Sequence, residues 1–315
     1  MPRTVSPARR HTGRSRPLRI AAALVVLAAL GGYLTVQYIT GSQVIEGCTV
    51  RSADGSDGEA RTYRMSPEQA VNAATISAVG TSRGMPERAV TIALATALQE
   101  SGLRNIEHGD RDSLGLFQQR PSQGWGTEKQ ILDPVYSAGE FYRHLAEVPG
   151  YSRLPLTVAA QRVQRSGFPQ AYAKHEPDAA LLAAALTGRT PAALNCAPPR
   201  ATAASPDAAK VRAELVRAFG KEVLPAAGTA PKDGGPAAGA AATSTVSVPV
   251  SAARASEDDG SARRGWELAH WAVAQSEALR LDEVSYGGRV WEAGTGWRTE
   301  RRESGTTDVR IRLAR

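Results

Sequence analysis

Residues 86–102 read PERAVTIALATALQESG, and this stretch predicts an apolar helix on which the rest of the fold prediction depends. Proline followed by glutamate is typical of a helix start, and the final glycine is typical of a helix end. Between these signals, small and aliphatic side chains recur at helical spacing. Glu100 lies in the last turn of this helix, two residues before the stop at Gly102.

Helix signals also dominate the sequence on either side of this stretch. Residues 66–69, Ser-Pro-Glu-Gln, form a capping box with proline at the first helical position. Asp133 and Pro134 open another helix, whose aromatic side chains near one face are expected to be core. We find no run of alternating apolar residues within residues 48–196, so this domain is expected to be mostly α. Further helices are expected over residues 157–165, 177–186 and 205–219.

The positive charge of the chain is concentrated at its amino terminus. Lys and Arg number 38 against 31 Asp and Glu, a net charge of +7, and six of the arginines lie in residues 1–19, which leaves 7 − 6 = +1 for the rest. A main body with so little excess charge argues against nucleic-acid binding, and no nucleic-acid partner is expected.

Residues 20–39, IAAALVVLAALGGYLTVQYI, carry no charge and follow the arginines directly. A helix of this length spans a hydrocarbon core of about 30 Å. The positive-inside rule then predicts a cytoplasmic arm over residues 1–19, a single transmembrane helix in the plasma membrane, and all later residues outside the cytoplasm. A cleaved signal peptide is the alternative.

The chain has two cysteines, Cys48 and Cys196. Exported proteins meet an oxidising environment, so we expect these two to form a disulfide, which marks residues 48–196 as the first domain. Two free buried thiols are the alternative. Two cysteines exclude a cysteine-ligated zinc cluster, and the histidines lack metal-binding spacing, so no metal or cofactor is expected.

The remainder of the chain changes in composition. Residues 197–222 read as a helical extension, and residues 223–261 are rich in Ala, Gly, Pro, Ser and Thr and are expected to be a flexible linker. Residues 262–315 predict a small α+β module with a helix, a hairpin across two glycines and one further strand. Four of the five tryptophans lie there and are expected to form its core, the alternatives being a sugar-stacking platform or a surface for a protein or wall partner.

Glu100 is the candidate catalytic residue. The negative end of the helix dipole and the apolar neighbours both disfavour the ionised carboxylate, as a general acid working near neutral pH requires. A solvated surface glutamate is the alternative.

Glu100 and Ser101, followed by Gly115-Leu116-Phe117-Gln118, resemble the active-site signature of lytic transglycosylases of the soluble, goose-lysozyme-like type. The longer runs GDRDSLGLFQQRPSQGWG (109–126) and DPVYSAGEFY (133–142) look like transglycosylase-like domains of actinobacterial exported proteins. The resemblance covers about residues 65–180 and implies a lysozyme-like helical domain. The predicted fold class is therefore mainly α, with one transmembrane helix before this domain and a small α+β module after it.

The resemblance also implies roles for individual residues. Glu100 would be the sole catalytic carboxylate, which protonates the glycosidic oxygen between N-acetylmuramic acid and N-acetylglucosamine and then removes the proton of the muramyl 6-hydroxyl. The product would be a 1,6-anhydro sugar, and the partner of the chain would be the peptidoglycan glycan strand. Substrate-binding roles would fall to Ser101, Gly115, Gln118, Gln119 and Tyr172, with core packing as the alternative for Tyr172.

The sequence departs from the family pattern at one point. The usual Ala-Tyr-Asn-Ala-Gly segment is missing, and its nearest counterpart at residues 158–161, Val-Ala-Ala-Gln, lacks both tyrosine and asparagine. Two functions therefore stay open: a membrane-anchored muramidase, and a peptidoglycan-binding or scaffold protein without turnover. Hydrolysis by water would need a second carboxylate, for which Asp110 and Asp112 are the candidates, with local turn bonding as their alternative role.

Overall fold

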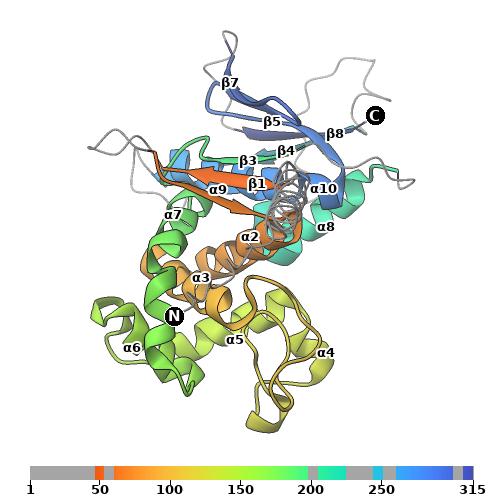
Figure 1. Ribbon diagram of the computed structural model, residues 1–315. Helices are drawn as coiled ribbons and strands as arrows, with labels where there is room; N and C mark the ends of the chain where they lie inside the picture. The colour runs from red at the N-terminus through yellow and green to blue at the C-terminus, as the bar shows by residue number, and fades with distance from the viewer. Residues whose placement is uncertain are drawn as a thin grey trace, which may run out of the picture. The chain divides into compact units, whose positions relative to one another are not determined.

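The computed structural model describes residues 47–52, 60–197, 205–224, 244–250, 260–300 and 308–314. The predicted basic arm (1–19) and membrane helix (20–39) lie outside these residues. Within the described ranges, no helix combines the length and the apolar character needed to cross a membrane. Figure 1 shows the arrangement of the described elements.

The fold combines helices with two antiparallel sheets, so the predicted mainly α class is wrong. The first sheet has the strand order β2-β1-β3, and the second has the order β4-β8-β5-β6-β7. The described strands are β1 (Cys48–Arg51), β2 (Thr62–Met65), β3 (Leu194–Cys196), β4 (Thr245–Pro249), β5 (Leu281–Tyr286), β6 (Arg289–Glu292), β7 (Gly296–Thr299) and β8 (Asp308–Leu313).

The helices supply most of the structure around the candidate site. The described α-helices are α2 (Pro67–Ser82), α3 (Glu87–Ser101), α4 (Glu128–Ile131), α5 (Pro134–Ala146), α6 (Leu156–Gln164), α7 (Glu176–Leu186), α8 (Ala208–Phe219), α9 (Gly260–Ala274) and α10 (Ser276–Leu279). Short 3₁₀ helices add η1 (Pro121–Gln123), η2 (Tyr151–Arg153), η3 (Pro169–His175) and η4 (Lys221–Val223).

The predicted helix boundaries are confirmed where capping residues mark them. Ser66 accepts a hydrogen bond from the backbone of Gln69, whose side chain bonds back to Ser66, so the capping box of α2 is complete. Helix α3 ends at Gly102, which adopts the left-handed conformation at φ 62°. Every residue of α3 from Ala89 to Leu98 is buried, so this helix is a core element on all sides.

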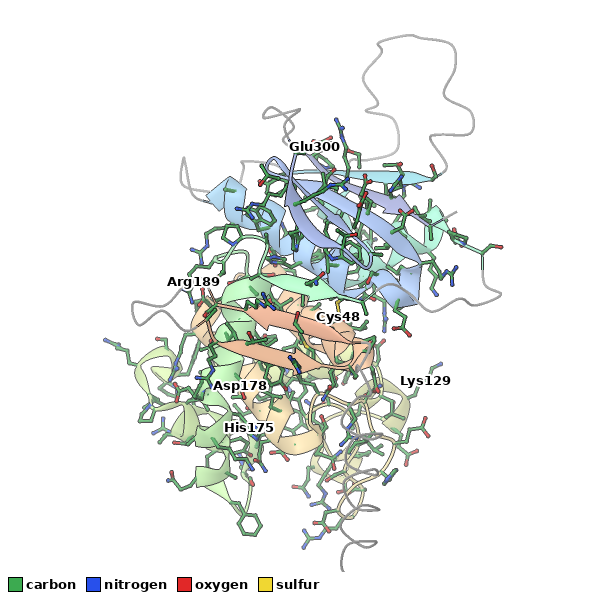
Figure 2. The ribbon with its side chains drawn as sticks, turned by 45° about the horizontal axis from the view of Figure 1, so that its top comes forward. Cys48, Lys129, His175, Asp178, Arg189 and Glu300 are labelled. Carbon is green, nitrogen blue, oxygen red and sulfur yellow. A yellow bond between two sulfur atoms is a disulfide. The ribbon has the colours of Figure 1, made fainter. Side chains whose placement is uncertain are left out.

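The first sheet was not predicted, because its strands are only three or four residues long and β3 pairs with β1 from the other end of the first domain. Strand β1 lies between β2 and β3 and is antiparallel to both. Cys48 is the direct partner of Cys196 in the β1–β3 register, and the two residues form the predicted disulfide. Figure 2 marks Cys48 on this sheet, with Asp178 of α7 and His175 of η3 on the helical segments beneath it.

The linker predicted over residues 223–261 contains a strand. Thr245–Pro249 forms β4, which pairs with β8 and buries Val246 and Val248 while Ser247 between them is exposed. The alternation spans only five residues in a segment of low hydrophobicity, and β8 supplies the pairing that the composition does not reveal. The predicted hairpin is confirmed: β5 and β6 join through Gly287 and Gly288, both at positive φ as a two-residue turn requires.

The carboxyl-terminal elements share their core with the first helices. Helix α9 contacts β5 and β8 and also α2 and α7 (Figure 1), and the described residues from 47 onward form one compact unit. A Cβ on Gly188 would lie 1.9 Å from the carbonyl oxygen of Arg263, so the backbones touch at this point. Core positions are confirmed for Trp266, Trp271 and Trp291, which are at most 6% exposed.

Two contacts fasten β3 to this carboxyl-terminal part. The indole N–H of Trp297 donates to the carbonyl oxygen of Leu194 at 2.7 Å, and that of Trp291 donates to Asn195 Oδ1 at 2.8 Å. Tryptophan N–H groups usually find such partners when they are buried. The strand that carries Cys196 is therefore held from both sides.

Candidate functional site

A cleft of about 820 Å³ lies beside the carboxyl-terminal end of α3. Its walls come from the loop after α3, the end of α5 and the segment that follows α6, and Figure 1 shows these elements at the end remote from the five-stranded sheet. The volume falls in the range of ordinary ligand sites. Glu100, Gln118 and Gln119 line this cleft together.

Glu100 occupies a rigid position at the edge of the core. It lies in the last turn of α3 and is half-buried. Two side chains of α2 hold the chain just beyond it: Gln69 Nε2 donates to the carbonyl oxygen of Gly102 at 2.7 Å, and Asn72 Nδ2 donates to that of Leu103 at 2.8 Å. Gly102 and Leu103 are both left-handed, so the chain turns sharply away and leaves the carboxylate at the cleft.

Tyr172 is the direct partner of Glu100. Its hydroxyl donates a hydrogen bond to Glu100 Oε1 at 2.6 Å, and its ring, on η3, is fully buried. Burial, and after it the hydrogen bond to the Glu100 carboxylate, raise the pKa of Tyr172 far above its ordinary value. The phenol therefore stays protonated and acts as a donor toward Glu100. Within the described residues Glu100 Oε2 makes no hydrogen bond, so this oxygen is left for a ligand.

Ser101 lies behind the cleft wall. Its buried hydroxyl is 2.8 Å from the carbonyl oxygen of Leu116 and 3.1 Å from that of Ala97, and it has one proton to donate between them. Ser101 does not belong to the cleft lining. Its position joins the end of α3 to the following turn, and a direct substrate contact is not part of this geometry.

The Gly115–Gln118 turn contributes Gln118 to the cleft lining, whereas Gly115 does not line the cleft. Leu114 and Gln119 exchange two backbone hydrogen bonds of 2.9 and 3.0 Å, which close a tight loop over the residues between them. Gly115 has φ 74°, and a Cβ there would lie 2.8 Å from the carbonyl oxygen of Ile131. Gln118 also adopts a positive φ, and its side-chain amide donates to Gly115 at 3.3 Å.

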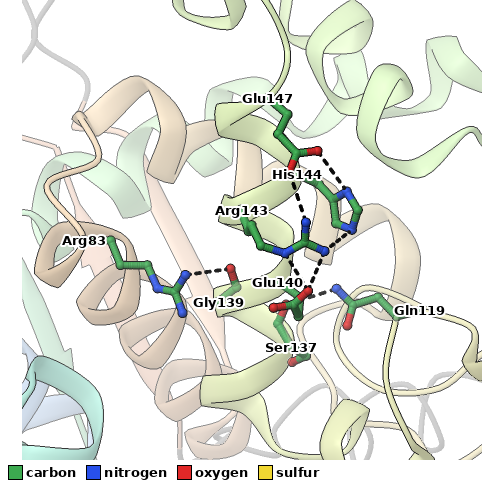
Figure 3. Close-up of polar contacts among 8 residues, drawn as sticks. All are labelled: Arg83, Gln119, Ser137, Gly139, Glu140, Arg143, His144 and Glu147. Carbon is green, nitrogen blue, oxygen red and sulfur yellow. Dashed lines mark hydrogen bonds and ion pairs between the residues drawn. The ribbon is translucent and has the colours of Figure 1, made fainter. Parts of the chain in front are cut away.

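Gln119 connects the turn to α5. Its side chain is 1% exposed and its Nε2 donates to the carbonyl oxygen of Ser137 at 3.0 Å (Figure 3). Its Oε1 is buried and has no hydrogen-bond partner among the described residues. Gln119 therefore holds the cleft wall in place and presents one unpaired acceptor.

The two aspartates of the loop have different surroundings. Asp112 accepts hydrogen bonds from the backbone of Ser122 at 2.8 Å and from Arg120 Nε at 2.6 Å. Hydrogen bonding to the side chain and the backbone of Ser122, and after it to Arg120, holds the pKa of its carboxyl well below the ordinary range. This is the turn role given as its alternative. Asp110, by contrast, is exposed and lines the same cleft as Glu100.

Several cleft residues were missed by the sequence reasoning. Segment 158–161 contributes no lining residue: Ala159 and Ala160 are core, and the side-chain amide of Gln161 donates to Ser166 at 2.7 Å. The residues just after it line the cleft instead, and Gln164 Nε2 donates to the carbonyl oxygen of Phe117 at 2.7 Å. The other missed lining residues include Trp125, His144, Arg162, Arg165 and Phe168.

A local signal existed for Trp125 alone, because a tryptophan between two glycines in a loop is poorly placed for a core. The arginines and His144 lie on helices or helix ends, where exposed polar residues are ordinary. No group of three or more His, Cys, Asp or Glu side chains in the described part of the chain is placed to hold a metal ion.

The arrangement provides the Glu100 carboxyl with one oxygen that makes no hydrogen bond among the described residues, a phenol that donates to its other oxygen, and a polar cleft that Asp110 and several arginines also line. Such a set suits proton transfer to and from an oxygen of a polar ligand.

Comparison with known proteins bears on a different part of the chain. A family model described as "VldE, C-terminal domain" matches residues 200–310, less than half of the chain. The matched range contains α8 to α10 and β4 to β7, and it includes none of the cleft residues. No curated protein matches the chain.

Proposed function

We propose that this chain cleaves peptidoglycan glycan strands between N-acetylmuramic acid and N-acetylglucosamine, with Glu100 as the single general acid and base. One observation supports the proposal most: the Glu100 carboxyl, bonded to Tyr172 through one oxygen, lines the same cleft as Gln118 and Gln119. A solvated glutamate on a convex face would have excluded it.

The proposed reaction uses the free oxygen of Glu100 twice. Protonated Oε2 donates its proton to the glycosidic oxygen, and the bond from that oxygen to the muramyl C1 breaks. The Glu100 carboxylate then removes the proton of the muramyl 6-hydroxyl while the 6-oxygen forms a bond to C1. This step gives a 1,6-anhydro sugar and returns Glu100 to its protonated form. No water is consumed, so one carboxylate is sufficient. Tyr172 keeps its proton and orients Glu100 through Oε1.

The outward-facing location at the plasma membrane is part of the same proposal. It is supported by the basic residues 1–19 followed by the uncharged residues 20–39, and by the disulfide, a feature of proteins in oxidising compartments.

The test compares the purified full-length chain with Glu100→Gln on isolated peptidoglycan, by mass spectrometry of released fragments. We expect anhydro-muropeptides from the parent chain and a loss of at least about 100-fold in the variant, as for removal of a general acid. Glu107→Gln is the matched control, because Glu107 is an exposed glutamate in the loop that follows α3 and does not line the cleft. Equal release by parent and Glu100→Gln would refute the catalytic role.

A non-catalytic peptidoglycan-binding protein is the second candidate. It is favoured by residues 158–161, which lack the expected tyrosine and asparagine and place their alanines in the core. Co-sedimentation with peptidoglycan and no released fragment would support this candidate, and absence of both binding and release would refute the two together.

A further inference from the structure

Trp125 is set apart from the other tryptophans of the chain. The remaining four lie between residues 266 and 297 and either are buried in the core or bond to β3. Trp125 is half-buried, packs with one part against the core and lines the cleft that holds Glu100. Its free surface therefore belongs to the cleft.

The backbone on both sides of Trp125 is specialised. Gly124 has φ 81° and Gly126 has φ 127°, conformations that residues with side chains rarely adopt. A Cβ on Gly126 would also lie 2.6 Å from the hydroxyl of Tyr136. Trp125 is therefore flanked on both sides by positions that favour glycine, and its own side chain lines the cleft.

The indole rests on a fixed imidazole. The rings of Trp125 and His144 have centroids 4.2 Å apart and are inclined at 53°. His144 Nε2 lies 2.9 Å from Arg143 Nη2, and because a guanidinium only donates, Nε2 must accept (Figure 3). The imidazole proton then lies on Nδ1, which faces Glu147 Oε2 at 3.8 Å.

His144 is uncharged near neutral pH in this setting. Burial, and after it the positive charge of Arg143, lower its pKa, and Arg165 acts in the same direction, while Glu147 and Glu140 oppose them. Arg143 is itself bound by Glu140 at 2.8 Å and by Glu147 at 3.0 Å. The platform under Trp125 is therefore a neutral ring whose orientation is held by an ion-pair network.

We propose that Trp125, supported by His144, is a carbohydrate-stacking platform that receives the apolar face of an uncharged 2-acetamido hexopyranose. The inference rests on the proposed function, because the same cleft would hold the glycan strand. An indole offers a wide rigid apolar surface for a ring whose C–H groups lie on one face. A surrounding amide such as that of Gln118 can bond to the hydroxyl and acetamido groups at the ring edge.

The experiment uses the full chain in the Glu100→Gln background, which prevents turnover, and the N-acetylglucosamine hexamer as the probe, with calorimetry as readout. Trp125→Leu keeps apolar bulk but removes the flat ring, and we expect it to weaken binding at least about tenfold. Trp125→Phe keeps a ring, and we expect binding within about threefold of the parent. Tyr63→Leu, a half-buried aromatic of β2 outside the cleft, serves as the control and should bind as the parent does.

Each result decides the inference. Three results would overturn it: equal loss of binding in Trp125→Leu and Trp125→Phe, unchanged binding in Trp125→Leu, or no binding of the hexamer by the parent. Melting curves of all variants identify any loss of folding. Dependence on Trp125 supports it even if the chain with Glu100 intact releases no muropeptide, in which case the catalytic proposal fails alone.

Discussion

At the residue scale, the hydrogen bond from Tyr172 limits what Glu100 can do. The phenol occupies Oε1 and keeps its proton, so proton exchange with a ligand must use Oε2. A carboxyl held at one oxygen by a buried donor has few orientations left. The geometry therefore assigns to Tyr172 the positioning of the acid rather than the chemistry.

Tyr172→Phe removes this contact and leaves the ring in place. We expect kcat on peptidoglycan to fall roughly tenfold with little change in KM, because a hydrogen bond to a charged group contributes about 1.5–3 kcal/mol and only part of that orients the acid. Tyr142→Phe is the matched control: its hydroxyl is equally buried but donates to the carbonyl oxygen of Ile76 at 3.0 Å. Tyr142→Phe should lower the melting temperature and leave kcat unchanged. A loss of kcat in Tyr142→Phe with none in Tyr172→Phe would contradict the positioning role of Tyr172.

Asp110→Asn tests whether water takes part. If the muramyl hydroxyl captures C1, the second acid is unnecessary, and we expect the rate of anhydro-product release to stay within about twofold of the parent. Mass spectrometry separates anhydro ends from reducing ends. A large loss of rate together with reducing ends from the parent chain would make Asp110 a base for hydrolysis.

The sequence was sufficient to place Glu100 in the last turn of α3, because the end of an apolar helix before a glycine is a local feature. It was insufficient for Ser101, whose hydroxyl direction depends on where the 115–118 turn meets α3 in space. The position of Trp125 between two glycines was a local signal that the sequence reasoning did not use, whereas its contact with His144 depends on how the loop and α5 assemble.

At the element scale, the turn after Leu114 depends on one glycine. Gly115→Ala forces an alanine into the left-handed conformation, which costs about 1–2 kcal/mol of stability. It also places a Cβ 2.8 Å from the carbonyl oxygen of Ile131. We expect a loss of unfolding free energy larger than that for Gly84→Ala, which is left-handed at φ 72° but has open space around it. Denaturant unfolding measures both, and equal losses would show that the contact with Ile131 is relaxed without cost.

The helices α2 and α5, whose starts carry chemical end signals, were predicted, and strands defined by distant partners were not; the short helix α4 was missed although Thr127 and Gln130 form a capping box at its start. The starts of α2 and α5 carry their own caps, from Ser66 and Asp133. The strands β1, β3 and β4 have three to five residues each, and their hydrogen-bond partners lie far along the chain. Strand propensity in so short a segment says little, because pairing and burial decide whether it forms.

At the scale of the whole molecule, His270 connects the two parts of the core. Its Nε2 accepts from the backbone N–H of Ala193 at 3.1 Å, so its Nδ1 carries the proton and donates to the carbonyl oxygen of Ala185 at 2.7 Å. Complete burial lowers its pKa to about 4, although the bond to Ala185 acts in the opposite direction. The rings of Trp266 and Trp297 lie against it.

Stability should therefore fall on acidification. The unfolded chain takes up a proton at His270 near pH 6.5, whereas the folded chain does so only near pH 4. The contribution of His270 to the unfolding free energy is therefore complete above pH 6.5 and is lost as the pH falls from 6.5 to 4. We expect a loss of roughly 2 kcal/mol between pH 7 and pH 5. His270→Gln keeps an amide in place of the ring and should remove this part of the slope.

The difference between the pH dependence of stability in the parent and in His270→Gln isolates the contribution of His270 from that of other titratable groups. Glu267 on the same helix is also buried, and burial raises its pKa, so it contributes a loss of stability as pH rises, opposite in sign. Parallel slopes of melting temperature against pH in the two chains would contradict the prediction.

The organisation of the whole molecule was the least predictable part. Composition divided the chain into a helical domain, a linker and a module, but α9 packs on α2 and α7, and β4 lies within the supposed linker. A low-complexity segment can still supply one strand when another part of the chain offers an open edge. Such pairing is a tertiary property, and local composition does not record it.

The direct pairing of Cys48 with Cys196 has a mechanical consequence. The chain enters and leaves the cleft-bearing part at neighbouring points. A force applied between residue 47 and residue 197 is therefore transmitted through the Cys48–Cys196 disulfide. The helix that carries Glu100 lies outside this path. If one end of the chain is held at a membrane while another part grips the cell wall, tension passes the cleft by, and the cleft keeps its shape under load.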